Sequence, residues 1–73
     1  MVYAEWVDSA VTVGWKRPDS ADYGVSHCET LGFLVLKNRS EVRIAMQVSD
    51  SGAVSEVMCI PRSCIKRLVK VTV

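Results

Sequence analysis

The chain has 73 residues, 49% of them hydrophobic, and a formal net charge of +1 at pH 7. This length accommodates one small domain, and the near-neutral charge excludes a global basic field that would attract nucleic acid. This hydrophobic fraction is larger than one small core can easily bury. Either the strands are therefore buried on both faces, or copies of the chain cover one another's apolar surface. We favour assembly into a homo-oligomer.

Charge distribution and cysteine content narrow the class of protein further. Residues 1–36 carry five acidic and two basic side chains, whereas residues 37–73 carry three acidic and seven basic ones. The basic half indicates either a local anion site or an ordinary solvated surface. Three cysteines, without an apolar leader or a run of about 20 apolar residues, predict a cytoplasmic protein with reduced thiols and no membrane span.

The N-terminal third of the chain predicts one strand and one long loop. Val2–Asp8 alternates apolar and polar residues, which is typical of a half-buried strand. Residues 9–26 show no clear periodicity and contain two glycines and a proline, so we expect a long, functional loop. Val11, Val13 and Trp15 are spaced for a short strand within it.

A bent strand is expected over residues 28–36, because Gly32 interrupts an otherwise apolar run. Such a bend is what a small closed barrel needs in a central strand. The following Lys37-Asn38-Arg39-Ser40 suits a tight hairpin, since Asn38 tolerates a left-handed conformation.

The next two strands form a second hairpin. Residues 41–48 alternate cleanly, and Ala45 is among the residues predicted to face outward. The side chains expected to face the core are Val42, Ile44, Met46 and Val48. Gly52 permits the turn that follows. Residues 53–60 form the fourth strand, which must end at Pro61 or lie at a sheet edge there, because proline cannot donate to a ladder.

The C-terminal segment predicts one helical turn and a fifth strand. Arg62–Cys64 forms the turn, and the β-branched residues near the end of the sequence favour a strand over residues 65–73. A short helix is the alternative, because the apolar residues from Ile65 onward also follow helical spacing. The strand from Leu68 onward would be an apolar edge, and its pairing with a neighbouring copy would close a ring.

The order of these elements resembles Sm-like and Src-homology-3-like (SH3-like) barrels. Gly32-Phe33-Leu34-Val35 is similar to the first Sm motif, and Ile60-Pro61 followed by Ile65 and Leu68 is similar to the second. The resemblance implies an all-β, five-stranded small barrel with a long loop between the first strand and the bent central strand. The usual Sm asparagine and N-terminal helix are absent, so the Sm-type RNA pockets are not carried over.

Nearly the whole chain is similar to short phage and prophage proteins. Their shared pattern is a Trp-x-Asp, a Gly-Trp, a Cys-x-x-x-Gly-aromatic-Leu strand and a late Ile-Pro followed by Ile. The residues that carry it here are Trp6-Val7-Asp8, Gly14-Trp15, Cys28 with Gly32-Phe33-Leu34, and Ile60-Pro61 with Ile65. The resemblance implies an Sm-like oligomeric ring in the cytoplasm of a host cell more than it implies any reaction.

Aromatic and basic side chains are the candidate ligand-binding residues. An exposed aromatic in the long loop would stack on a base, although packing in the core or between subunits is the simpler interpretation. Basic residues at the first hairpin tip and after Pro61 would line one rim, and repetition around a ring would make that rim a phosphate-binding surface. The predicted ligand-binding residues are Trp15, Tyr23, Arg39, Arg62 and Lys66.

Catalytic and metal sites are not expected. His27 and Cys28 are neighbours on a strand and point to opposite faces, so they do not pair as base and nucleophile. His27 with Cys59 and Cys64 lacks a fourth zinc ligand, and the three cysteines are expected to be small buried apolar residues. The sequence holds no Ser-His-Asp set or glycine-rich phosphate loop. We therefore expect neither an enzyme nor a cofactor.

Two functions are open from the sequence. The first is a non-enzymatic, phage-type oligomer that binds RNA or a small nucleotide, for example to sequester a host nucleotide signal and so evade host defence. The alternative is an adaptor that engages a host or virion protein through residues 9–27.

Overall fold

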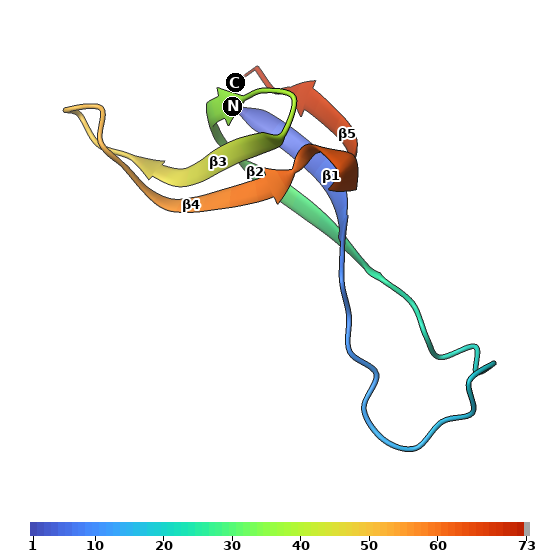
Figure 1. Cartoon of the computed structure of the whole chain (residues 1–73). Helices are drawn as coiled ribbons and strands as arrows, with labels where there is room; N and C mark the ends of the chain where they lie inside the picture. The colour runs from blue at the N-terminus through green and yellow to red at the C-terminus, as the bar shows by residue number, and fades with distance from the viewer. Residues whose placement is uncertain (73) are drawn as a thin grey trace.

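Five antiparallel strands form one sheet in the order β4-β3-β2-β1-β5 (Figure 1). The computed structural model describes residues 1–72. Its elements are β1 (Val2–Asp8), β2 (Ser26–Lys37), β3 (Glu41–Val48), β4 (Val54–Pro61), the 3₁₀ turn η1 (Arg62–Cys64) and β5 (Ile65–Lys70). β4 and β5 are the edges of the described sheet and do not pair with each other, so the sheet is open. The predicted all-β architecture is confirmed.

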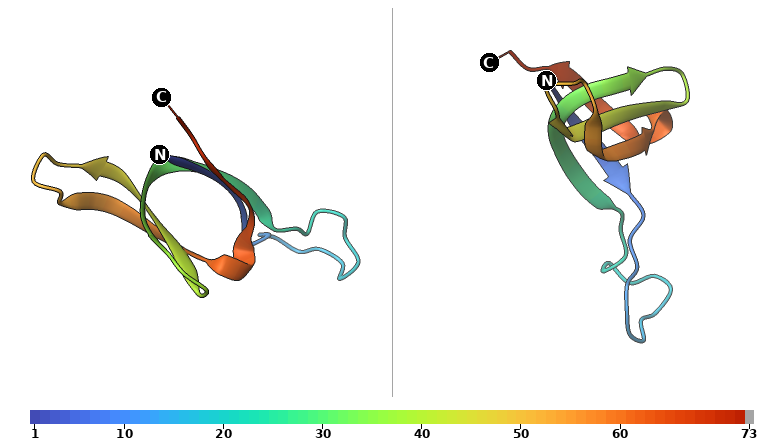
Figure 2. Two further views of the ribbon diagram at one scale, coloured as in Figure 1. Left: turned by 90° about the horizontal axis from the view of Figure 1, so that it is seen from above. Right: turned by 90° about the vertical axis from the view of Figure 1, so that its left-hand side faces the viewer.

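β2 is strongly curved, as predicted (Figure 2), and it changes its partner strand next to Gly32, although its register irregularity lies between Leu34 and Leu36. The first half of β2 pairs with β1 up to Gly32, and the second half pairs with β3 from Phe33 onward. A Cβ atom on Gly32 would lie 2.6 Å from the Ala45 carbonyl oxygen and 2.7 Å from Ile44 Cγ2. Only glycine therefore lets β2 pass this closely over β3, and the sheet curls around a small core (Figure 2).

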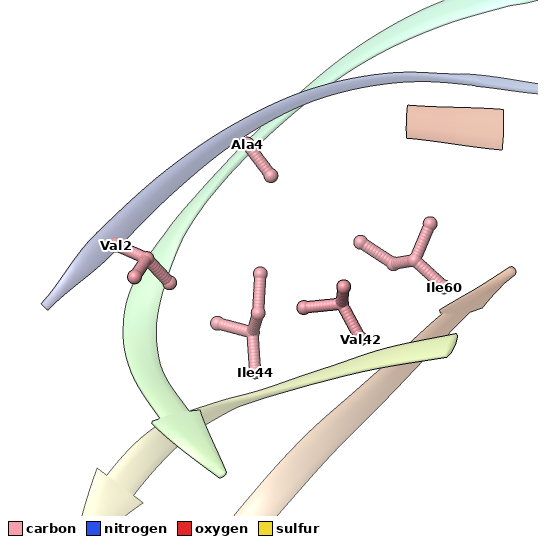
Figure 3. Close-up of a cluster of buried hydrophobic side chains, with 5 residues drawn as sticks. All are labelled: Val2, Ala4, Val42, Ile44 and Ile60. Carbon is pink, nitrogen blue, oxygen red and sulfur yellow. The ribbon is translucent and has the colours of Figure 1, made fainter. Parts of the chain in front are cut away.

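The core is a small cluster of aliphatic side chains on the concave side of the sheet. Side chains from β1, β3 and β4 point toward one another there (Figure 3). The buried members are Val2, Ala4, Val42, Ile44 and Ile60. Trp6, Cys64, Ile65 and Leu68 are half-buried and pack against this cluster. Trp6 is thus at the margin of the core, where its indole N–H donates to Thr30 Oγ1 at 3.0 Å.

Most of the predicted elements are present. β1 and β3 have the expected boundaries, β2 extends beyond residues 28–36 at both ends, and β4 ends at Pro61 on a sheet edge. The turn at η1 and the fifth strand are confirmed, and the helical alternative is wrong because Ile65–Lys70 pairs with β1. The fifth strand was expected to extend to Val73 but ends at Lys70; Val71 and Thr72 are not in a strand, and Val73 lies outside the described residues.

Three details of the prediction are wrong. No strand forms at Val11–Trp15, because no other strand lies alongside to supply its backbone partners. Met46 and Val48 are exposed although they share a face with Ile44, because β3 and β4 extend past the rest of the sheet. Ala45 is fully buried although it faces outward, since larger residues lie opposite it on both neighbouring strands.

Two projections make the chain elongated. We call residues 9–25, which join β1 to β2, the arm, and residues 46–56, the distal β3–β4 hairpin, the ribbon. The arm and the ribbon extend in opposite directions from the sheet (Figures 1 and 2). The radius of gyration is 15.6 Å, against about 11 Å for a compact domain of this length. The chain exposes 5769 Å², against about 4,500 Å² for a compact monomer of this size.

Candidate functional site

A basic depression lies where the β2–β3 hairpin meets η1. Its volume is about 510 Å³, and Lys37, Asn38, Arg39 and Arg62 line it. We call these four residues the basic cradle. Two of the five predicted ligand-binding residues, Arg39 and Arg62, are thus brought together from segments that are distant in the sequence. All four side chains are exposed and open to a ligand from solvent.

Hydrogen bonds of the Asn38 side chain and of the backbone fix the hairpin tip and η1, the two segments of the basic cradle, relative to each other. Asn38 Oδ1 accepts from the backbone N–H groups of Ser40, at 2.8 Å, and Glu41, at 2.9 Å. The Asn38 N–H donates to the Glu41 carbonyl at 3.0 Å and closes the hairpin. The Arg62 N–H donates to the Ser40 carbonyl at 2.9 Å, which ties η1 to the hairpin tip. The positions of both arginine Cα atoms are therefore set by the fold.

The electrostatic balance of the basic cradle favours an anion. Three of its four lining residues are cationic, and none is acidic. The neighbouring carboxylate of Glu41 is engaged elsewhere, because Arg43 Nη2 donates to Glu41 Oε1 at 2.7 Å. This hydrogen bond and the charge of Glu41 raise the pKa of Arg43. The cations of the cradle therefore keep their charge available for a ligand such as phosphate.

The other three predicted ligand-binding residues lie elsewhere in the chain. Lys66 borders a smaller hollow of about 190 Å³, whose other lining residues are Glu5, Trp6, His27, Cys28 and Glu29. Trp15 and Tyr23 belong to the arm, and both are exposed. Within one chain the predicted set is thus divided among three places. Lys37 and Asn38, which were not in that set, join the cradle because they share the hairpin tip with Arg39.

Acidic side chains gather on the outer face of β1 and β2. Glu5 lies opposite Glu29 in the ladder, and Arg67 Nη1 approaches Glu5 Oε1 at 3.7 Å from the other side. The Tyr3 hydroxyl donates to Glu5 Oε1 at 3.0 Å. Desolvation, this hydrogen bond and the negative charges of Glu29 and Glu5 raise the pKa of Tyr3. This face repels anions and so differs from the basic cradle.

The cysteines differ from the sequence expectation. Cys59 is exposed and Cys28 and Cys64 are half-buried, so the prediction of three buried thiols is wrong. Cys59 lies opposite Arg43 on the outward face of an edge strand, where no further layer covers it. Among residues 1–72, no three His, Cys, Asp or Glu side chains gather as metal ligands would.

Comparison of the chain with protein-family models, with curated proteins and with solved structures gave no significant match. In the described part of the chain, no helix has the length and apolar character needed to cross a bilayer. A functional assignment therefore depends on the geometry and charge of the basic cradle.

Proposed function

We propose that the chain is a non-enzymatic binding module whose basic cradle holds the phosphates of RNA or of a small nucleotide. The observation that carries the proposal is the meeting of Lys37, Arg39 and Arg62 in one depression without an acidic neighbour in its lining. Guanidinium groups suit phosphate because their planar N–H donors match two of its oxygens. The proposal includes the phage-type role of sequestering a host nucleotide signal in the host cytoplasm.

The proposed assembly is a homo-oligomeric ring of small barrels of Sm-like or SH3-like type. The strand order and the curvature of β2 support this proposal, since they place β4 and β5 at the two edges of a strongly curled sheet. Pairing of the β5 edge of one copy with the β4 edge of the next would satisfy both unpaired edges. Repetition of the cradle around a ring would increase its total positive charge. Trp15, Tyr23 and Lys66 would join a cradle only from a neighbouring copy.

Binding of labelled single-stranded RNA and of a dinucleotide to purified protein tests the proposal. Arg62→Ala is expected to weaken binding about tenfold to a hundredfold, the usual effect of losing a hydrogen bond to a charged group. The matched control is Arg67→Ala, which removes an exposed arginine outside the cradle. Native mass spectrometry reports whether the oligomer is intact in both variants.

Equal affinities of Arg62→Ala and wild type would refute the proposed site. Preference for one of the two probes identifies the ligand class. Binding is also expected to weaken as salt is raised, because phosphate contacts release counterions. An affinity that does not change with salt contradicts a phosphate site.

The exposed apolar residues of the arm favour a second candidate, an adaptor for a host or virion protein. A pull-down from host lysate after nuclease treatment distinguishes the two candidates. A protein partner that resists nuclease supports the adaptor, whereas co-purified material that absorbs at 260 nm supports nucleotide or RNA binding.

A further inference from the structure

The arm carries an apolar stripe that none of the described residues of its own chain covers. Val11, Val13 and Trp15 recur at every second residue, and their exposed fractions are 89%, 82% and 103%. The tip of the arm is held by its own contacts, which include a 2.9 Å ion pair between Lys16 Nζ and Asp22 Oδ2. An exposed tryptophan beside two exposed valines is typical of a surface that packs against a partner.

The ribbon carries a second uncovered apolar stripe, which continues the core. Met46 and Val48 extend the core face of Ile44, and the ladder places Met58 opposite Ile44 and Val54 opposite Val48. Met46, Val48 and Val54 of the ribbon are exposed, Met46 by 64%, and so is Met58 next to the ribbon. A hollow of about 320 Å³ lies within it, bounded by Thr30, Ile44, Met46, Glu56, Val57 and Met58.

Glu56, which borders the hollow in the ribbon stripe, has an unusual backbone conformation. Its φ is +55°, a left-handed conformation that is rare for a non-glycine residue within a strand. No ion pair is described for its carboxylate in residues 1–72. Arg17, two residues after Trp15, has only a 3.8 Å contact with Asp19 between highly exposed side chains. Arg17 can therefore exchange its long contact with Asp19 for an ion pair with Glu56 of a partner stripe.

The uncovered surface is large enough for a stable interface with a second copy, and each copy supplies both apolar stripes. The chain exposes 5769 Å², about 1,300 Å² more than a compact monomer of this size, whereas a stable interface needs only about 800 Å² from each partner. The arm does not cover its own ribbon, because the two project from opposite ends of the sheet (Figures 1 and 2).

We infer that the arm of one copy packs on the ribbon stripe of a second copy. Trp15 fills the hollow beside Met46 and Met58, where thioether sulfurs make favourable contacts with aromatic rings, and Arg17 pairs with Glu56. Trp15 then serves assembly and not ligand stacking. The inference concerns a different surface from the basic cradle and rests on the proposed function only in expecting an oligomer.

Sedimentation equilibrium of the full chain without nucleotide tests this inference. Trp15→Ala is expected to raise the dissociation constant of the assembly about 30-fold, as for a central interface tryptophan. Val25→Ala is the matched control, because it shortens an exposed apolar side chain on the other limb of the arm. Circular dichroism checks that each variant keeps its strands.

Charge reversal provides a second, independent test of the inference. Arg17→Glu and Glu56→Arg are each expected to weaken the assembly, and the double variant is expected to recover it. Three outcomes overturn the inference: a wild-type chain that stays monomeric at submillimolar concentration, an assembly that Trp15→Ala leaves unchanged, and single reversals that the double variant does not rescue. A chain that stays monomeric and binds a foreign protein through Trp15 gives the first of these outcomes, and it therefore also overturns the inference. Nucleotide binding is tested separately, by comparing Arg62→Ala with wild type, so failure of the proposed function is distinguishable from failure of this inference.

Discussion

Substitution of Gly32 by alanine should destabilise the fold by overpacking the close contact between β2 and β3. The added methyl would lie 2.6 Å from the Ala45 carbonyl oxygen, and a backbone atom in a central strand moves only if the strand moves. Overpacking of this kind costs about 2 kcal/mol, a large part of the roughly 4–11 kcal/mol expected for a domain of this length. The midpoint of thermal unfolding should therefore fall by roughly 8–16 °C.

Thermal unfolding followed by circular dichroism at one fixed protein concentration measures this effect. Gly24→Ala is the matched control, because a Cβ there meets nothing within 4 Å and the backbone φ lies outside the left-handed region. It should be neutral or raise stability by about 0.4–1 kcal/mol through the unfolded state. A fall of less than about 2 °C for Gly32→Ala would refute the close approach of β2 and β3.

Two further predictions concern a phenol and a turn. The raised pKa of Tyr3 implies stability that is complete below about pH 10 and is lost as the pH rises through the folded-state pKa. In a Tyr23→Phe background, ultraviolet titration should show a lower titration midpoint for Tyr3 when Glu5 is replaced in Glu5→Gln. An unchanged midpoint contradicts the contribution of Glu5 to the raised pKa of Tyr3. Asn38→Ala should cost about 1 kcal/mol in urea unfolding, because Oδ1 accepts two backbone hydrogen bonds. Asn38→Asp should keep that stability but weaken anion binding, and equal binding by Asn38→Asp and wild type would count against the basic cradle.

Local patterns predicted the strands and the bend because each depends on neighbouring residues. Gly32 within an apolar run, Asn38 in a short polar break and Pro61 after a strand each have one main structural consequence. The adjacency of Arg39 and Arg62 was expected instead from the order of elements in a small barrel, in which the first hairpin tip and the turn after Pro61 line one rim. The pairing of Glu41 with Pro61 brings the two segments together.

Exposure was harder to predict, because it depends on what lies across the sheet. The alternation at Met46 and Val48 is that of a core strand, but β3 and β4 extend past β1 and β5 at this point (Figure 1), and both side chains are exposed. The spacing of Val11, Val13 and Trp15 suits a strand, but residues 1–72 provide no neighbouring strand for it. In both cases periodicity indicated an apolar face correctly and did not indicate where its partner is located.

The position of β1 between β2 and β5 constrains how the protein is made. β1 holds Val2 and Ala4 of the core but pairs on its second side with a strand that is synthesised only after residues 65–70 are translated. Until then one hydrogen-bonding edge of β1 is unpaired on the nascent chain, although its core partners Val42, Ile44 and Ile60 are already translated. Folding is therefore expected to finish after translation of β5, and fragments that stop before η1 should aggregate or be degraded in the cell.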